Sequence, residues 1–339
     1  MNVSKTSLEI SHFPVLLSEV IKICSPIAGK NFLDCTFGGG SYSKTLLSYK
    51  NTKVTALDRD KYILKFANKL NQNYKNRFNF HHEKFSNLDK IIKKELFDVA
   101  IFDLGLSSFQ LKDLSRGFSF NSKDKLDMTM GLSSVSAEDV VNNCEENVLK
   151  LIIKIFGDEK EASKIAKNIV LKRNNKKITT AKELVEIIEM SKKRDRSKKI
   201  NISTKTFQAL RIFVNKETTE LIEGIIKATK VLKPGGKLIT ISFHSIEDKI
   251  IKFYFSNYSS NKSKPSRYMP EKINNEINLF NDYRNKIVKA SNLELKKNPP
   301  SRSAKLRFAT RSKNIFKFPD ELKIKFNKYL ELESLYEKN

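Results

Sequence analysis

Apolar and polar positions form alternating blocks along the first hundred residues. Four short apolar runs have the length of β-strands: 30–35, 52–58, 77–85 and 96–108. Between the second and third runs, apolar residues recur every three or four positions, as on one face of a helix: Ile63, Phe66, Ala67 and Leu70. Strands separated by helices predict right-handed βαβ units and a parallel sheet.

The pattern becomes mostly helical between Lys112 and Thr206. Gly157-Asp158 is expected to end one helix, and Thr180-Ala-Lys-Glu183 has the form of a capping box that opens another. Strand signals then return. A long helix is predicted to end at Lys233, followed by a Pro-Gly-Gly turn and by strands at 237–243 and 303–312. These elements predict an α/β fold, a parallel-type sheet flanked by helices, with an inserted helical domain.

The same pattern suggests a division of the chain. We expect residues 1–111 to form the first part of the sheet domain, 112–206 the helical insertion and 207–312 the second part. Residues 191–199 should be a charged loop, and the Asn- and Lys-rich stretch 256–300 a long, partly disordered polar loop. The end, 313–339, is expected to be a charged helix or tail.

The net charge of the chain indicates which kind of molecule it binds. The chain has 339 residues, with 64 Lys and Arg against 38 Asp and Glu, a net charge of +26. Such a surplus favours a polyanion, and nucleic acid above all. The three cysteines are scattered, without a C-x-x-C pair, so we expect no metal site and a reducing, cytoplasmic location. No apolar run approaches 18 residues, so we expect no membrane span.

A glycine cluster follows the first predicted strand in "LDCTFGGGSYSKTLL". Gly38-x-Gly40-x-x-Ser43 is a dinucleotide fingerprint without its last Gly, and Gly38-x-x-x-x-Ser43-Lys44-Thr45 is a phosphate-binding loop without its second Gly. Asp58 ends the second strand at the spacing of a carboxylate that binds a ribose diol. Asp103 ends the fourth strand at the same predicted edge. A phosphate loop leaves Asp58 without a role, and "KPGG" is frequent in S-adenosylmethionine-dependent methyltransferases, so that third interpretation is favoured.

Nine motifs occur together and in order along the chain: "HFPVLLSEV", "DCTFGGGSYS", "ALDRD", "DLGLSSFQL", "RGFSF", "LDMTM", "TFQALRIFVN", "PGGKLITISFHSIED" and "NPPSRSAKLR". Over residues 12–312 the chain thereby resembles the ribosomal RNA small subunit methyltransferase H family, also called MraW. The resemblance implies a Rossmann-like methyltransferase fold with a helical insertion. It also implies methyl transfer from S-adenosylmethionine to N4 of a cytidine in the decoding region of 16S ribosomal RNA.

Site residues follow from this resemblance. The cofactor contacts of the family fall on the following positions: Gly38, Gly40, Ser41, Tyr42, Asp58, Phe85, Asp103 and Gln110. Asp58 would bind the ribose, and the ring of Phe85 would stack on adenine. The chain departs from the commoner family pattern at Ser41, Tyr42 and Phe109, where Gly, His and Pro are frequent.

The implied chemistry requires an acceptor for an N–H of the cytosine amine, whose lone pair is delocalised into the ring. Many amino-methyltransferases place an acid or amide followed by Pro-Pro-aromatic after strand four, where this chain has "DLGLSS". Asp103 is the first candidate acceptor and Ser107 a lesser one. His244 follows a late strand and is either a further catalytic candidate or a structural histidine.

Basic residues within the motifs are candidate RNA contacts. Arg116 and Arg211 are expected to bind phosphate or base, with a buried ion pair as the alternative for Arg211, which lies on the apolar side of its helix. Arg302, Lys305 and Arg307 form a basic cluster beside the last strand. The expected partner is 16S rRNA within the small ribosomal subunit, and a homodimer stays open. The competing hypothesis is a catalytically weak RNA-binding assembly factor on the same fold.

Overall fold

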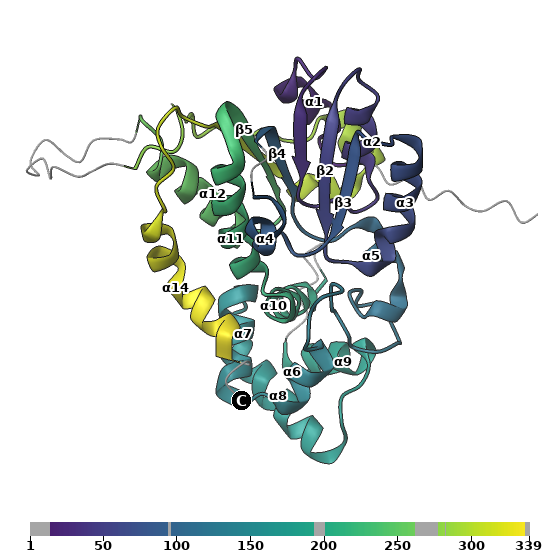
Figure 1. Cartoon of the computed structure of the whole chain (residues 1–339). Helices are drawn as coiled ribbons and strands as arrows, with labels where there is room; N and C mark the ends of the chain where they lie inside the picture. Colours follow the sequence, from purple (N-terminus) through teal and green to yellow (C-terminus); the bar gives the residue numbers. More distant parts are fainter. Residues whose placement is uncertain (1–13, 94–95, 193–200, 262–276, 282, 336–339) are drawn as a thin grey trace, which may run out of the picture.

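The computed structural model describes residues 14–93, 96–192, 201–261, 277–281 and 283–335. Its centre is a six-stranded sheet in the order β3-β2-β1-β4-β5-β6 (Figure 1). The strands are β1 (Asn31–Asp34), β2 (Lys53–Asp58), β3 (Phe78–His82), β4 (Phe97–Asp103), β5 (Leu232–Ser242) and β6 (Lys305–Thr310). β1 to β5 are parallel and β6 runs antiparallel to β5. The predicted α/β fold with a mainly parallel sheet is confirmed.

Both faces of the sheet are covered, which explains the uninterrupted apolar runs. In β4, Val99 and Ile101 belong to one buried cluster, while Ala100 and Phe102 belong to the other. In Figure 1, helices α2 and α3 lie on one side of the sheet, and α11 and α12 lie on the other. The central strands are therefore buried on both faces and hold the ends of β1, β2 and β4 in a fixed relation.

The helices of eight or more residues are α1 (Leu17–Cys24), α3 (Leu64–Asn73), α7 (Glu146–Gly157), α8 (Ala162–Asn175), α9 (Ala181–Ser191), α10 (Thr204–Asn215), α11 (Glu217–Val231), α12 (Ser245–Asn257) and α14 (Asp320–Ser334). The shorter ones are α2 (Ser41–Leu47), α4 (Leu88–Ile91), α5 (Ser108–Lys112), α6 (Ala137–Asn143) and α13 (Asn292–Lys297). Figure 1 shows α6 to α10 grouped beyond the sheet edge where α5 lies. Among the described residues, no helix combines the length and the apolar character needed to cross a bilayer.

Several predicted helix ends are confirmed. α7 ends at Gly157, and Asp158 follows in the left-handed region. The capping box of Thr180 and Glu183 opens α9. The expected helix at the end of the chain is α14, which buries Phe326 and Tyr329 against α7 and α11. The charged loop expected at 191–199 lies almost wholly outside the described residues.

The predicted single long helix before β5 is wrong. The chain forms two helices there, because Lys216 adopts φ 49° and redirects the backbone between α10 and α11. α11 ends at Val231, and β5 begins at Leu232 rather than at Lys237. The Pro-Gly-Gly segment is an irregularity within that strand, where the register with β4 shifts between Phe97 and Val99.

Two predicted loop and helix assignments also need correction. Residues 117–136 are not helical; this segment packs so closely that a Cβ on Gly131 would lie 2.0 Å from the backbone oxygen of Arg59. In the stretch expected to be a polar loop, Leu279 and Phe280 are fully buried. α13 and a short 3-10 turn at Pro299–Ser303 follow them. Residues 262–276 of that stretch lie outside the described residues.

Candidate active site

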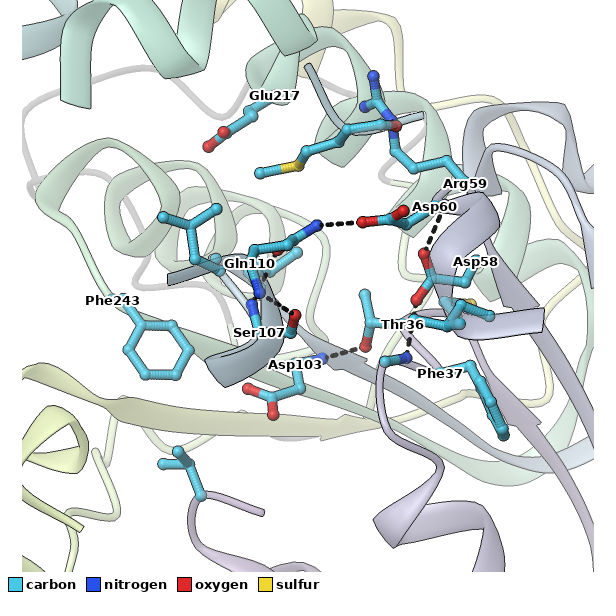
Figure 2. Close-up of a pocket in the computed structure, with 18 of the residues that line it drawn as sticks. Thr36, Phe37, Asp58, Arg59, Asp60, Asp103, Ser107, Gln110, Glu217 and Phe243 are labelled. Carbon is cyan, nitrogen blue, oxygen red and sulfur yellow. Dashed lines mark hydrogen bonds between the residues drawn. The ribbon is translucent and has the colours of Figure 1, made fainter. Parts of the chain in front are cut away.

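A hollow of about 1310 Å³, counted with its open mouth, lies at the carboxyl edge of β1, β2, β4 and β5. This edge is where open parallel sheets bind ligands, next to the point at which strand order reverses. Here the reversal lies between β1 and β4. Figure 2 shows Asp58, Asp103 and Gln110 around the hollow, which we call the cavity. Residues as far apart in the chain as Val15 and Pro300 contribute to its lining, so the cavity exists only in the folded chain.

Asp58 ties the glycine loop to the end of β2. Its Oδ2 accepts the Gly38 N–H at 2.7 Å, and its Oδ1 accepts the Asp60 N–H at 2.9 Å (Figure 2). Burial raises the pKa of Asp58, and these two backbone hydrogen bonds oppose the rise. A carboxylate has about four acceptor positions, so two remain for a ligand diol. Because the loop amide faces a carboxylate, a phosphate would be repelled, and the phosphate-loop interpretation loses its support.

The remainder of the glycine loop is shaped by packing. Gly40 has φ 75°, and a Cβ there would lie 2.6 Å from the Phe37 ring. Tyr42 is buried, and its hydroxyl donates a hydrogen bond to the Val15 carbonyl oxygen. Ser41 and Tyr42 both line the cavity. Ser43 donates from Oγ to Asp34 Oδ2 at 2.6 Å, which explains a serine where both alternative motifs need Gly.

Phe85 gives the cavity a rigid aromatic wall. Its ring packs edge-on against Phe102, with ring centres 5.4 Å apart. On another side, Gly224 of α11 leaves so little room that an added Cβ would lie 2.4 Å from the Phe85 ring. An aromatic ring held this way presents a fixed apolar surface for a flat ligand ring.

Ser107 and Gln110 are used to cap α5. The Gln110 N–H donates to Ser107 Oγ at 3.3 Å, and the Ser107 N–H donates to Gln110 Oε1 at 2.9 Å. Gln110 Nε2 donates to Asp60 Oδ2 at 2.9 Å. Both residues line the cavity, but this geometry favours a capping role for Ser107 over the catalytic role that we predicted.

Asp103 carries an unsatisfied buried oxygen. Within the described part of the chain its Oδ1 has no hydrogen-bond partner, while its backbone N–H donates to Thr36 Oγ1 at 2.7 Å. Burial raises the pKa of Asp103 well above its ordinary value, and the nearby charges of Asp34 and Glu247 add to the rise, while a hydrogen bond with Tyr42 opposes it. Buried polar atoms are rarely left unpaired. The position therefore suits a cationic or hydrogen-bonding ligand group that restores the carboxylate.

His244 lies behind the cavity wall rather than in its lining. Its Nε2 is 3.0 Å from Glu247 Oε1 and 3.9 Å from Glu217 Oε2. Burial opposes ionisation of Glu247, but the charge and hydrogen bond of His244 lower the pKa of that carboxyl. Arg211 pairs with Glu217 at 2.8 Å. These four side chains form a buried charge network, so the structural alternative fits His244 better than a catalytic role.

The same network bears on metal binding. Glu217, His244 and Glu247 offer ligand atoms within 4.8 Å of one another. Arg211 already pairs with Glu217, which reduces the negative charge that a cation would meet. Two carboxylates of the network, Glu217 and Glu247, also face the cavity.

The expected RNA contacts of three arginines need correction. Arg116 pairs with Asp60 at 2.6 Å, with side chains 7% and 2% exposed. Arg211 forms the buried ion pair considered as its alternative, and Arg307 pairs with Asp248 at 2.8 Å with 3% of its side chain exposed. None of the three faces solvent as a phosphate contact would. Lys305 also pairs with Asp248 but is 38% exposed, and Arg302 is exposed.

Acidic residues dominate the polar lining of the cavity. Six carboxylates line it: Asp58, Asp60, Asp103, Glu217, Glu220 and Glu247. Among the described residues, Arg59 is the single basic residue in the lining, and its guanidinium donates to the carbonyl oxygens of Met130 and Asn215. Arg116 and Arg211, which lie outside the lining, pair with Asp60 and Glu217 and offset part of this charge. A chain with a net charge of +26 nevertheless contains a cavity whose lining is mainly acidic, which favours a cationic ligand over phosphate.

Sequence reasoning missed several lining residues: Glu217, Phe243, Glu247, Asn298 and Pro300. Phe243 had a detectable signal, because it follows β5 at the same edge as Asp103. Glu217 and Glu247 had none, since each depends on how a helix start is oriented. Asn298 and Pro300 reach the cavity only because the segment before β6 folds back over the sheet edge.

The chain is similar in sequence to known methylases. A family model described as the MraW methylase family matches residues 9–312. The ribosomal RNA small subunit methyltransferase H of Ehrlichia canis (strain Jake) is 43% identical, covering 87% of this chain and 98% of its own length. That of Rickettsia massiliae (strain Mtu5) is 41% identical, covering 88% and 97%. A solved rRNA methylase structure from Streptococcus thermophilus is 12% identical with TM-score 0.36, covering 84% and 87%. By its matched length and its identity to these relatives, the chain belongs to the MraW methylase family.

Proposed function

We propose that this protein is an S-adenosylmethionine-dependent methyltransferase that modifies N4 of a cytidine in the decoding region of 16S rRNA. Membership of a methylase family and relatives named for the ribosomal RNA of the small subunit support this function. The observation that carries it is the cavity itself: six carboxylates against one arginine at the carboxyl edge of the sheet. Such a lining suits a cationic methyl donor.

The donor set of the cavity fits this cofactor. Asp58 keeps acceptor positions for a ribose diol after binding Gly38 and Asp60. Phe85 offers a rigid apolar face for adenine. The unpaired Oδ1 of Asp103 would meet a positively charged group. When bound, the cofactor supplies a methyl group on a cationic sulfur.

The RNA side of the proposal rests on charge. A surplus of 26 positive charges attracts rRNA phosphates, while the acidic cavity repels them. Of the parts of an RNA chain, the uncharged base is therefore better suited to the cavity than the phosphate. Exposed Arg302 lies two residues after the lining residue Pro300. This position suits a phosphate next to an inserted base.

The direct test uses purified protein, labelled S-adenosylmethionine and small ribosomal subunits that lack the modification. We expect label in 16S rRNA, and N4-methylcytidine in the digested RNA by mass spectrometry. The absence of label in rRNA would refute the proposal. Label on another nucleotide would retain the methyltransferase and refute the cytidine assignment. Calorimetric titration with the cofactor separates the enzyme from a non-catalytic assembly factor, since a chain that does not bind it cannot be the enzyme.

A further inference from the structure

The cavity has two ends, separated by Asp103. Since β4 lies between β1 and β5 in the sheet, the end of β4 divides the carboxyl edge in two. One end contains Asp58 and Phe85, which come from β2 and the turn after β3. The other contains Phe243, which follows β5, and Asn298 with Pro300, which precede β6. In Figure 2, Phe243 and Asp58 lie on opposite sides of Asp103.

The end beyond Asp103 has its own character. Phe243 is half-buried, and its ring packs so closely on Gly105 that a Cβ there would lie 3.1 Å away. Asn298 is also half-buried and follows α13. Its backbone N–H donates to the Glu294 carbonyl oxygen at 2.7 Å, and its carbonyl oxygen accepts the Ser301 N–H at 3.0 Å. The backbone of Asn298 is therefore fixed, and the residue lines the cavity.

We propose that this end binds the acceptor base, with the Asn298 side-chain oxygen accepting an N–H of the exocyclic amine and Phe243 stacking on the ring. This assignment rests on the proposed function. An aromatic ring and an amide acceptor are the groups that hold an unstacked base. The amide-Pro-Pro sequence that many amino-methyltransferases carry after strand four is absent from "DLGLSS". In this fold, Asn298-Pro299-Pro300 supplies the amide and the two prolines, with Ser301 in place of the aromatic residue, and Asn298 and Pro300 line the same cavity.

The reaction balances with these groups. The N4 lone pair forms the bond to the methyl carbon, the sulfur–methyl bond breaks, and its electron pair stays on sulfur as a neutral thioether. Positive charge then lies on N4, which loses a proton to water at the open mouth. Asn298 binds the second N–H throughout and takes no proton, so its contribution is to orient the lone pair toward the methyl group.

An amide suits this position better than the neighbouring acid. The pKa of Asp103 is raised well above its ordinary value by burial, so its acceptor strength depends on pH and on nearby charge. A carboxamide oxygen accepts a hydrogen bond at every accessible pH. In this assignment Asp103 interacts with the cationic methyl donor, and Asn298 orients the amine.

The test compares Asn298→Ala with Asn292→Ala, a matched change at an exposed position of α13. With unmethylated small subunits, we expect Asn298→Ala to lower single-turnover methyl transfer by about 10²-fold. Affinity for S-adenosylhomocysteine, measured by calorimetry, should be unchanged. Asn292→Ala should match the wild type in both. Phe243→Leu should weaken binding of the RNA substrate and leave cofactor affinity unchanged.

Asn298→Asp distinguishes an acceptor from a structural residue. The introduced carboxyl group accepts the amine N–H more strongly when it is ionised than when it is protonated. This variant should therefore transfer methyl with a new acidic limb in its pH profile. The acidic limb of Asn298→Asp also tests the acceptor role of Asn298 if the Asn298→Ala variant does not fold. Three results would each overturn this assignment alone. Asn298→Ala could transfer methyl at the wild-type rate, or it could lose cofactor affinity by the same factor as it loses transfer. Asn298→Asp could show no acidic limb in its pH profile. A wild-type protein that transfers no methyl to rRNA would instead refute the proposed function, and this assignment with it.

Discussion

Replacing Asp58 by alanine tests how the cavity binds its cofactor. The carboxylate accepts two backbone N–H groups, from Gly38 at 2.7 Å and Asp60 at 2.9 Å, and keeps two acceptor positions toward the cavity. The change removes a charged acceptor from any diol bound there. Hydrogen bonds to charged groups contribute about 1.5–3 kcal/mol. Since about 1.4 kcal/mol is tenfold in affinity, we expect cofactor affinity to fall by roughly 10- to 150-fold.

The measurement is calorimetric titration of S-adenosylmethionine into the wild type and the variant. Asp113→Ala is a matched control, because Asp113 accepts the Ser115 N–H at 3.2 Å and lies outside the cavity lining. Both variants lose a carboxylate that orders a turn, so both should lose some thermal stability. Only Asp58→Ala should lose cofactor affinity. Equal affinity in Asp58→Ala and the wild type would refute the ribose role of Asp58.

Three further predictions follow from burial and packing. Gly224→Ala places a Cβ 2.4 Å from the Phe85 ring, so it should weaken cofactor binding in the same titration, and unchanged affinity would argue against the aromatic wall. Asp34 has its pKa raised to about 6 by burial, so the folded state holds a proton that the unfolded state has lost. The contribution of Asp34 to the free energy of unfolding therefore falls as pH rises from about 4 to 6, by up to about 3 kcal/mol at pH 7. Asp34→Asn has no group that titrates there, so its free energy of unfolding, measured by urea melts, should lack this fall. Equal pH dependence in the two proteins would contradict this. Arg302→Ala should lower rRNA affinity and the slope of its salt dependence in filter binding, whereas Arg307→Ala should lower the melting temperature, since Arg307 is 3% exposed.

The sequence predicted the part of the site that strand ends determine. Asp58 and Asp103 end β2 and β4, and parallel strands bring their carboxyl ends to one edge, so hydrophobic pattern alone brought these carboxylates together. The glycine loop followed for the same reason. Alternation of strands and helices was likewise sufficient for the mainly parallel sheet.

Long-range ion pairs could not be predicted in this way. The positive charges of Arg116 and Arg307 suggest RNA contacts, yet their partners, Asp60 and Asp248, lie 56 and 59 residues away in the chain. The sequence alone does not distinguish an arginine that is paired in the interior from one that faces solvent. Lys216 presents a similar difficulty, because its left-handed backbone, which splits α10 from α11, occurs at a residue with no special turn preference.

The chain has a large net positive charge, whereas the lining of its cavity is mainly acidic, and this difference affects the proposed reaction. The surface carries the excess of Lys and Arg that makes the net charge +26, while six carboxylates line the cavity. On the proposed function, the surface would attract the phosphates of RNA, and the cavity would admit an uncharged base and a cationic methyl donor. Methyl transfer turns the sulfonium into a neutral thioether, so the attraction of Asp103 and its neighbours for the cofactor weakens once the reaction is complete. Asp103→Asn should accordingly reduce affinity for S-adenosylmethionine more than for S-adenosylhomocysteine, because only the first carries the sulfonium charge. Equal losses for the two ligands, in parallel calorimetric titrations, would show that Asp103 does not respond to that charge.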